Sequence, residues 1–267
     1  MKLKILIENT VFQPEAKGEL GFSLYIETDD NHRILFDTGQ SGLFADNAKL
    51  FDIDVNTIDS LVLSHGHYDH TGGLQRFLSL NDHASIFAKS GFDEEKYGRG
   101  SRYIGLPKDI HIPQNRLQII NSPTEIAEGV FILPQIHIFE NNDTHFTHLQ
   151  VKDGNNFIED VFNDEQYIAI RRNGRLHIIS GCAHRGIVNI IRSTQELFSE
   201  PIESIMGGFH TLHEEPATIH SLTQKLNAIG IKKVVVCHCT GIDQYAQIKQ
   251  EFQGEICYGH VGMNIFL

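Results

Sequence analysis

The chain has 267 residues, of which 40% are hydrophobic, and a formal net charge of −12 at pH 7. This length and composition suit one α/β domain with a substantial core, spanning residues 1–267. An acidic surface repels the phosphate backbone, so we expect no nucleic-acid partner and disfavour nuclease functions.

The segment Met1–Glu8 alternates between apolar and polar residues, which is typical of a strand rather than of a secretory signal. No apolar run approaches the length of a transmembrane helix, so we expect no membrane partner. The four cysteines form neither a C-x-x-C pair nor a dense disulfide framework, which indicates a cytoplasmic protein. They are Cys182, Cys237, Cys239 and Cys257.

Apolar runs predict strands at 3–7, 21–27, 33–36, 60–63 and 84–88, and later at 117–120, 130–133, 167–171, 176–180, 204–206, 233–237 and 255–258. Helices are predicted at 71–78, 187–198, 217–229 and 242–252. Strand-rich segments that are followed by helices, twice along the chain, indicate two facing sheets with helices outside. No Pro-, Gly- or Ser-rich linker divides the chain.

The first strongly informative segment follows the predicted strand at 60–63. It places three histidines and one aspartate within six positions: His65, His67, Asp69 and His70. Neutral imidazole and carboxylate are the ligands of zinc-like metals. If the segment is extended, residues two apart point the same way, so His65 and His67 share one metal while Asp69 and His70 bind a second.

Residues 89–116 form a polar, glycine-bearing insertion that contains Arg99 and Arg102. One interpretation is a lid or substrate loop in which the two arginines bind an anionic group, and the other is a solvated surface excursion. The run Asp164–Gln166 has two similar interpretations. It is either a polar edge of the site or, as is more common for such a run, a solvated turn.

Three further histidines, His184, His210 and His238, each follow an apolar predicted strand and lie near a glycine. The carboxyl ends of strands are where α/β folds gather ligands. Cys237 and Cys239 flank His238, and alternation along an extended segment would direct both thiols away from its imidazole. A separate thiolate zinc site is therefore disfavoured.

These motifs resemble the metallo-β-lactamase superfamily, whose signature is the H-x-H-x-D-H stretch at 65–70. The Asp-Thr-Gly turn at 37–39 also resembles this superfamily, and the segments 180–184, 207–210 and 237–241 resemble one branch of it. It contains metal-dependent hydrolases and the archaeal 7,8-dihydropterin-6-methyl-4-(β-D-ribofuranosyl)aminobenzene-5'-phosphate synthases. The resemblance implies an αββα four-layer sandwich with two mixed sheets flanked by helices. It also implies two divalent ions, with zinc favoured over manganese or iron.

On this basis we expect His184 to join His65 and His67 on the first metal. We expect His238 to join Asp69 and His70 on the second metal, with Asp69 also orienting the attacking water. His210 would replace one of the histidine ligands or face the substrate as an acid. Asp37 would orient a metal-binding imidazole.

The superfamily commonly has a bridging aspartate where this chain has Cys182. Three alternatives follow: Cys182 is a thiolate ligand, a water alone bridges the metals, or the thiol is merely packed. We favour the last two together, because a buried cysteine is usually an inert small hydrophobe.

The favoured function is a dimetal hydrolase that acts on a small phosphorylated or ester substrate through a metal-activated water. The substrate is expected to be a small anionic molecule. A pterin-type transferase, as in the archaeal relatives, is a second hypothesis. A non-catalytic metal-bearing sensor is a third, and the sequence does not define the oligomeric state.

Overall fold

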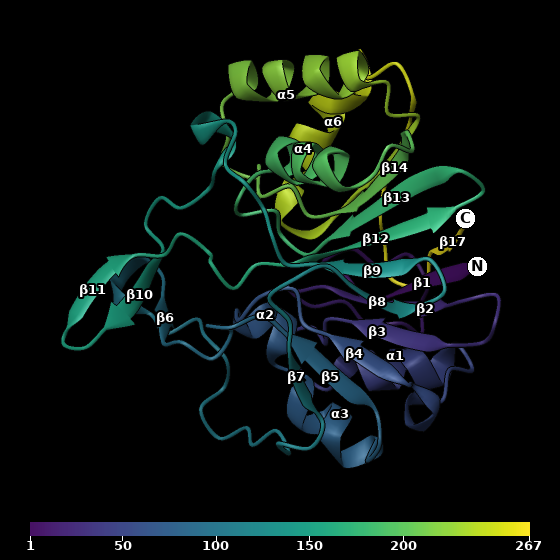
Figure 1. Ribbon diagram of the computed structural model, residues 1–267, viewed down its shortest axis with the longest axis vertical. Helices are drawn as coiled ribbons and strands as arrows, with labels where there is room; N and C mark the ends of the chain where they lie inside the picture. Colours follow the sequence, from purple (N-terminus) through teal and green to yellow (C-terminus); the bar gives the residue numbers. More distant parts are fainter.

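The computed structural model describes residues 1–267, which form two seven-stranded sheets face to face between layers of helices (Figure 1). The first sheet is antiparallel from β17 to β3 and parallel from β3 to β7. In spatial order its strands are Asn264–Phe266 (β17), Lys2–Ile7 (β1), Ser23–Glu27 (β2), Arg33–Phe36 (β3), Ser60–Val62 (β4), Ser85–Ala88 (β5) and Leu117–Ile119 (β7).

The second sheet repeats this plan, with parallel pairing from β16 to β13 and antiparallel pairing from β13 to β8. In spatial order its strands are Glu255–Tyr258 (β16), Lys233–Val236 (β15), Ile202–Gly207 (β14), Arg175–Ser180 (β13), Tyr167–Arg172 (β12), Val130–Leu133 (β9) and Thr124–Ala127 (β8). Each sheet therefore has a parallel half, and parallel strands end together at one edge.

Helices cover the two outer faces (Figure 1). On the second sheet lie Ile187–Leu197 (α4), Pro216–Ile229 (α5) and Ile242–Glu251 (α6). On the first sheet lie Leu43–Leu50 (α1) and Leu74–Leu80 (α3), while the single helical turn Tyr68–Thr71 (α2) lies at the end of this sheet. Single 3-10 turns occur at Val55–Thr57, Arg99–Ser101, Asn141–Asp143 and His238–Thr240. None of the helices is long and apolar enough to cross a membrane.

The buried apolar residues form three clusters, one for each interface of the four layers. In β3, Leu35 packs in the cluster with α1 and α3, whereas Ile34 and Phe36 pack in the cluster between the sheets. In β12, Ile168 belongs to the cluster between the sheets and Ala169 to the cluster beneath α4 and α5. This period-two division confirms the four-layer αββα sandwich.

A third, small sheet stands apart from the sandwich, at the end opposite the two chain termini (Figure 1). It joins Lys96–Tyr97 (β6) to the hairpin of Gln150–Asp153 (β10) and Asn156–Glu159 (β11). The predicted insertion at 89–116 therefore contributes one strand to a sheet that is completed by residues 150–159.

The helix predicted at 71–78 is two helices, because α2 ends at Thr71 and α3 begins at Leu74. The strands β6, β8, β10, β11 and β17 and the helix α1 were not predicted. The hairpin strand β11 is exposed along its whole length, so no apolar alternation marks it.

Candidate metal centre

The predicted ligands lie on loops that leave the carboxyl ends of the central strands. The H-x-H-x-D-H loop follows β4, and Cys182 and His184 follow β13. His210 follows β14 and His238 follows β15. Because β13, β14 and β15 are parallel neighbours, their loops converge at one edge of the sandwich.

The loop backbone is unusually constrained at this edge. Ala183, His210 and His238 have φ angles of 52°, 53° and 52°, in the left-handed region that costs a non-glycine residue about 1–3 kcal/mol. A Cβ on Gly66 would lie 1.9 Å from the carbonyl oxygen of Phe92. Gly66 is thus required for close backbone approach to the 89–116 segment.

Three imidazoles surround one point. The ring centroids of His65 and His67 lie 4.6 Å apart, and that of His184 lies 4.9 and 5.0 Å from them. The Nε2 atoms of His65 and His67 and both ring nitrogens of His184 are buried without a hydrogen-bond partner. Burial holds the pKa of all three well below the usual histidine value, which favours the neutral form that binds metals.

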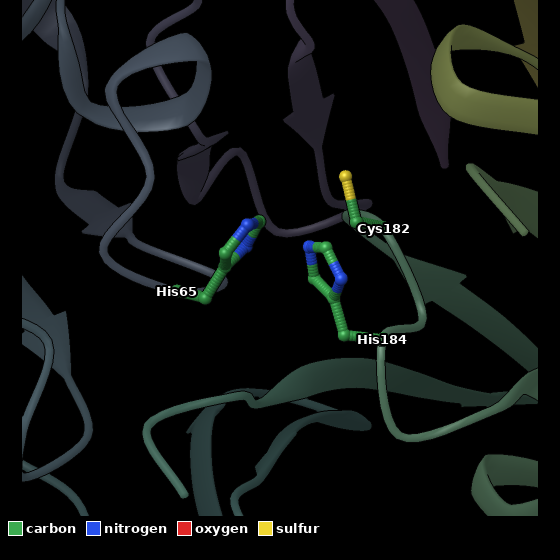
Figure 2. A group of neighbouring side chains, drawn as sticks. All are labelled: His65, Cys182 and His184. Carbon is green, nitrogen blue, oxygen red and sulfur yellow. The ribbon is translucent and has the colours of Figure 1, made fainter. Parts of the chain in front are cut away.

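His65 and His184 approach this point from opposite sides, as Figure 2 shows. Cys182 lies on the same loop as His184, and the ligating atoms of these three residues all lie within 4.8 Å of one another. His184 stacks on Phe162, with ring centroids 3.7 Å apart and planes at 8°. This stacking fixes the imidazole orientation.

A second group adjoins the first. The ligating atoms of His70, Cys182 and His238 all lie within 4.8 Å of one another, and Asp69 Oδ2 lies 3.3 Å from His238 Nε2. Burial opposes the charge of Asp69, but the hydrogen bond from His238 and the nearby imidazoles outweigh it and lower its pKa. The charges of Cys239 and Asp69 overcome the burial of His238 and raise its pKa to about 9.

Asp37 lies behind the ligands. Its Oδ2 accepts hydrogen bonds from His70 Nδ1 and from the Ser64 hydroxyl, both at 2.7 Å. His70 therefore presents Nε2 toward Cys182, whose Sγ lies 3.1 Å away. The Ser64 oxygen in turn lies 2.9 Å from His65 Nδ1, which leaves His65 Nε2 free to face the centre.

The alternation argument for Cys237 and Cys239 was wrong. The chain turns at His238–Thr240 instead of remaining extended. Cys237 packs between the sheets, whereas Cys239 lies at the centre, where its Sγ lies 3.6 Å from the carbonyl oxygen of Cys182. The ligating atoms of Cys182, His210 and Cys239 also lie within 4.8 Å of one another.

The prediction that the H-x-H-x-D-H segment is extended was wrong for the second half of the segment. His67 precedes the helical turn α2, and Asp69 and His70 lie within it. The helical turn, and not strand alternation, separates Asp69 and His70 from the first pair.

The solvated-turn interpretation of Asp164–Gln166 was also wrong. The three residues are 2%, 1% and 0% exposed. Burial raises the pKa of Glu165 to about 7. The residues contact the loops that carry His65 and His184.

The two arginines of the insertion differ in position. Arg102 Nη2 donates to the Tyr68 hydroxyl at 3.0 Å, and its guanidinium lies 5.3 Å from the centre of the Tyr68 ring. Tyr68 is the first residue of α2, so Arg102 is held against the helical turn that carries Asp69 and His70. Arg99 is an exposed residue of the preceding 3-10 turn.

His145 is a neighbour of the site that sequence reasoning missed. Its ring lies 5.5 Å from that of His210, its Nδ1 lies 3.1 Å from Glu214 Oε1, and its backbone N–H donates to the carbonyl oxygen of His184 at 2.8 Å. Burial and the neighbouring His210 lower its pKa to about 4. No strand or glycine motif precedes His145 to mark it in the sequence.

An αββα sandwich with histidine-bearing loops at one edge defines a class of metalloproteins. The model of the metallo-β-lactamase superfamily matches residues 16–152, and the chain belongs to this superfamily.

Two similar proteins come from Methanocaldococcus jannaschii. An uncharacterized protein is 30% identical over 97% of this chain and 98% of its own length. A 7,8-dihydropterin-6-methyl-4-(β-D-ribofuranosyl)-aminobenzene-5'-phosphate synthase is 30% identical over 91% of this chain and 88% of its own length.

The crystal structure of Tm1679, described as a metal-dependent hydrolase of the β-lactamase superfamily, is also similar. It has a TM-score of 0.87 and 30% identity, and the match covers 100% of this chain and 99% of that one.

Proposed function

We propose that the protein is a dimetal hydrolase, with zinc as the preferred ion, that acts on a small anionic phosphate or ester. Its first site would use His65, His67 and His184, and its second site Asp69, His70 and His238. The observation that carries this proposal is the set of buried imidazole nitrogens without hydrogen-bond partners. Such atoms are costly in a folded protein unless a ligand satisfies them.

When bound, two divalent ions supply Lewis acidity, which lowers the pKa of a water and polarises the oxygens of an ester or phosphate. The protein's own groups would orient the reactants. Asp69 is held as a carboxylate and is suited to accept a hydrogen bond from the attacking water. His210 has a buried Nδ1 without a partner and is suited to donate a proton to the leaving group.

We further propose that Cys182 would serve the metal centre as a thiolate ligand. This departs from the packed thiol favoured from the sequence. Its Sγ belongs to the group with His65 and His184 and also to the group with His70 and His238. A bound cation deprotonates a coordinating thiol even where burial raises its pKa.

We expect Cys182→Ser to eliminate the thiolate charge-transfer absorption of the cobalt-loaded protein and to weaken binding of at least one ion. The near-ultraviolet spectrum and metal titration measure the two effects. Cys257→Ser is the matched control, because Cys257 lies on the edge strand β16, packs against the cluster between the sheets and belongs to none of the three groups of ligating atoms. An unchanged spectrum in Cys182→Ser would return Cys182 to the role of a packed thiol.

The anionic substrate preference is supported by the position of Arg102. We expect Arg102→Ala to raise KM for a phosphorylated substrate by about tenfold, the low end for a hydrogen bond to a charged group, because Arg102 is exposed. An uncharged ester should react almost as before. The effect should shrink at high salt, since exposed charges are screened.

Arg33→Ala is the control for this experiment, because Arg33 lies at the start of β3, at the edge away from the ligand loops. An equal rise in KM for the charged and the uncharged substrate would contradict anion recognition by Arg102.

A second candidate function is supported by the relative named as a synthase. In a transferase, the ions would activate a diphosphate leaving group. A panel of phosphodiesters, thioesters and phosphate esters, assayed with zinc, manganese or iron, tests hydrolysis. Diphosphate release that requires an aromatic amine acceptor would favour transfer, and tight ligand binding without turnover would favour a sensor.

A further inference from the structure

Three consecutive residues between β11 and β12 link the ligand loops of the two sheets. We propose that Asp164 and Glu165 are positioning residues of the metal centre. They would hold the His65–His67 loop and the His184 loop at the separation that the ions require. This inference rests on the proposed metal site and adds residues that the superfamily motifs do not include.

The contacts to the first loop are made by Asp164 and Gln166. Asp164 Oδ2 accepts the backbone N–H of Gly66, between the two histidine ligands, at 2.8 Å. Gln166 donates its backbone N–H to the carbonyl oxygen of Ser64 at 2.8 Å and its side-chain N–H to that of Leu63 at 2.8 Å. The loop after β4 is therefore held at three of the four residues 63–66.

The contacts to the second loop are made by Glu165. Its Oε1 accepts the backbone N–H of His184 at 2.7 Å, and its Oε2 accepts that of Arg185 at 2.8 Å. Because Glu165 lies between Asp164 and Gln166 in the chain, a shift of one loop displaces the other. The stacked ring of His184 and the unpartnered nitrogens of His65 and His67 are thereby kept in register.

The two carboxylates differ in how their charge is compensated. Asp164 Oδ1 accepts from the buried Lys96 ammonium at 2.9 Å, and this ammonium also donates to Asp160 at 2.6 Å. The Arg185 guanidinium is directed to the carbonyl oxygens of Ile136 and Val161. The Glu165 carboxylate therefore accepts hydrogen bonds only from the two backbone N–H groups, and the nearby Lys89 ammonium donates instead to the backbone carbonyl oxygen of Glu165, at 3.3 Å. A buried carboxylate without a direct cation is costly unless another charge offsets it. Two divalent ions at the adjacent centre would provide that charge.

A similar connection supports the other ion site. Glu8, just after β1 of the first sheet, is fully buried, and its Oε1 accepts the backbone N–H of His238 at 2.6 Å. A buried carboxylate thus crosses from the first sheet to a ligand loop of the second. Changing a residue that holds a metal ligand in place typically lowers the metal affinity roughly 10–100-fold.

The test compares Glu165→Gln with the wild-type protein. Glutamine keeps the size and one acceptor but removes the charge and turns an amide N–H toward a backbone donor. We expect cobalt and zinc affinity, measured by competition with a chromophoric chelator, to fall roughly 10–100-fold. The absorption bands of bound cobalt should shift. The Tm of the metal-free protein should remain equal or rise, while the Tm gained on metal addition should shrink.

Asn81→Ala is the matched control. Asn81 is also a buried polar brace, which donates to the carbonyl oxygens of Val55 and Ile58 at 3.0 and 2.8 Å, at the opposite end of β4 from the ligands. We expect it to lower the Tm of the metal-free and the loaded protein equally, with unchanged metal affinity. Glu165→Asp retains the charge with a shorter reach, and we expect an intermediate affinity. If Glu165→Gln does not fold, Glu165→Asp serves as the test variant in its place.

The outcomes separate the two proposals. If the wild-type protein binds no divalent metal, the proposed function fails, and the positioning role fails with it. If the wild-type protein binds metal and both Glu165 variants bind it within twofold of the wild-type affinity, only the positioning role is overturned. A drop in metal-free Tm equal to that of Asn81→Ala, with unchanged cobalt bands, would likewise assign Glu165 to the fold alone.

Discussion

Replacing His67 by alanine is expected to abolish turnover while leaving a folded protein. The ring of His67 lies in a loop after β4 and belongs to none of the three apolar clusters, so its removal takes little from the core. It removes one of three imidazoles around a single point, and the loss of turnover should exceed the roughly 10–100-fold caused by changes behind the ligands. Circular dichroism and an activity assay on the same sample measure the two effects.

His220→Ala is the control for this variant. His220 is an exposed histidine of α5 that pairs with Glu251 at 2.6 Å, so its loss should leave both turnover and metal content unchanged. Full activity in His67→Ala would remove His67 from the site. Loss of the circular dichroism signal would instead mean that the loop supports folding.

Removing the metals is expected to have the largest effect on stability. The protein should bind about two divalent ions per chain. At a free-ion concentration of about 1,000 times Kd, each site contributes about 4.1 kcal/mol, which corresponds to roughly 8–16 °C in Tm for a domain of 150–250 residues. The metal-free protein should be less stable to heat, because the buried carboxylates near the centre then lack the compensating cations.

Elemental analysis of protein purified without chelator, and thermal unfolding before and after chelation, measure these quantities. Adding back zinc should restore the original Tm, which separates reversible ion loss from damage by the chelator. Saturation at one ion per chain would rule out the dimetal site. An unchanged Tm after complete removal of both ions would contradict the stabilising role.

Much of the sandwich was predictable, because the apolar pattern of each strand reflects which of its faces are buried. Residues such as Ile34, Leu35 and Phe36 alternate between two apolar interfaces, and the predicted bounds of β3, β9 and β16 match the structure. The hairpin β10–β11 was missed because an exposed strand has no such constraint. The helix α1, Leu43–Leu50, was also missed.

The metal motif was equally visible, because four potential ligands within six positions form a local pattern. Its partners were assigned from strand ends and glycines, and His184 and His238 do lie beside it. The geometry of the short turns was not predictable in this way. The turn at His238–Thr240 brings Cys239 into the centre, although strand alternation places it on the opposite side.

The sequence by itself determined the four-layer class, the superfamily and the histidine-rich centre, because apolar periodicity and ligand spacing are local properties. The tertiary structure decided which polar residues lie beside that centre. Asp164 and Glu165 are as polar as a solvated turn, and His145 has no motif around it. Their roles depend on contacts with residues such as Gly66 and His184, which are 98 and 19 positions from the carboxylates that hold them. Only folding brings such groups together and removes them from water. Burial then raises the energetic cost of each unsatisfied hydrogen-bonding group and each uncompensated charge.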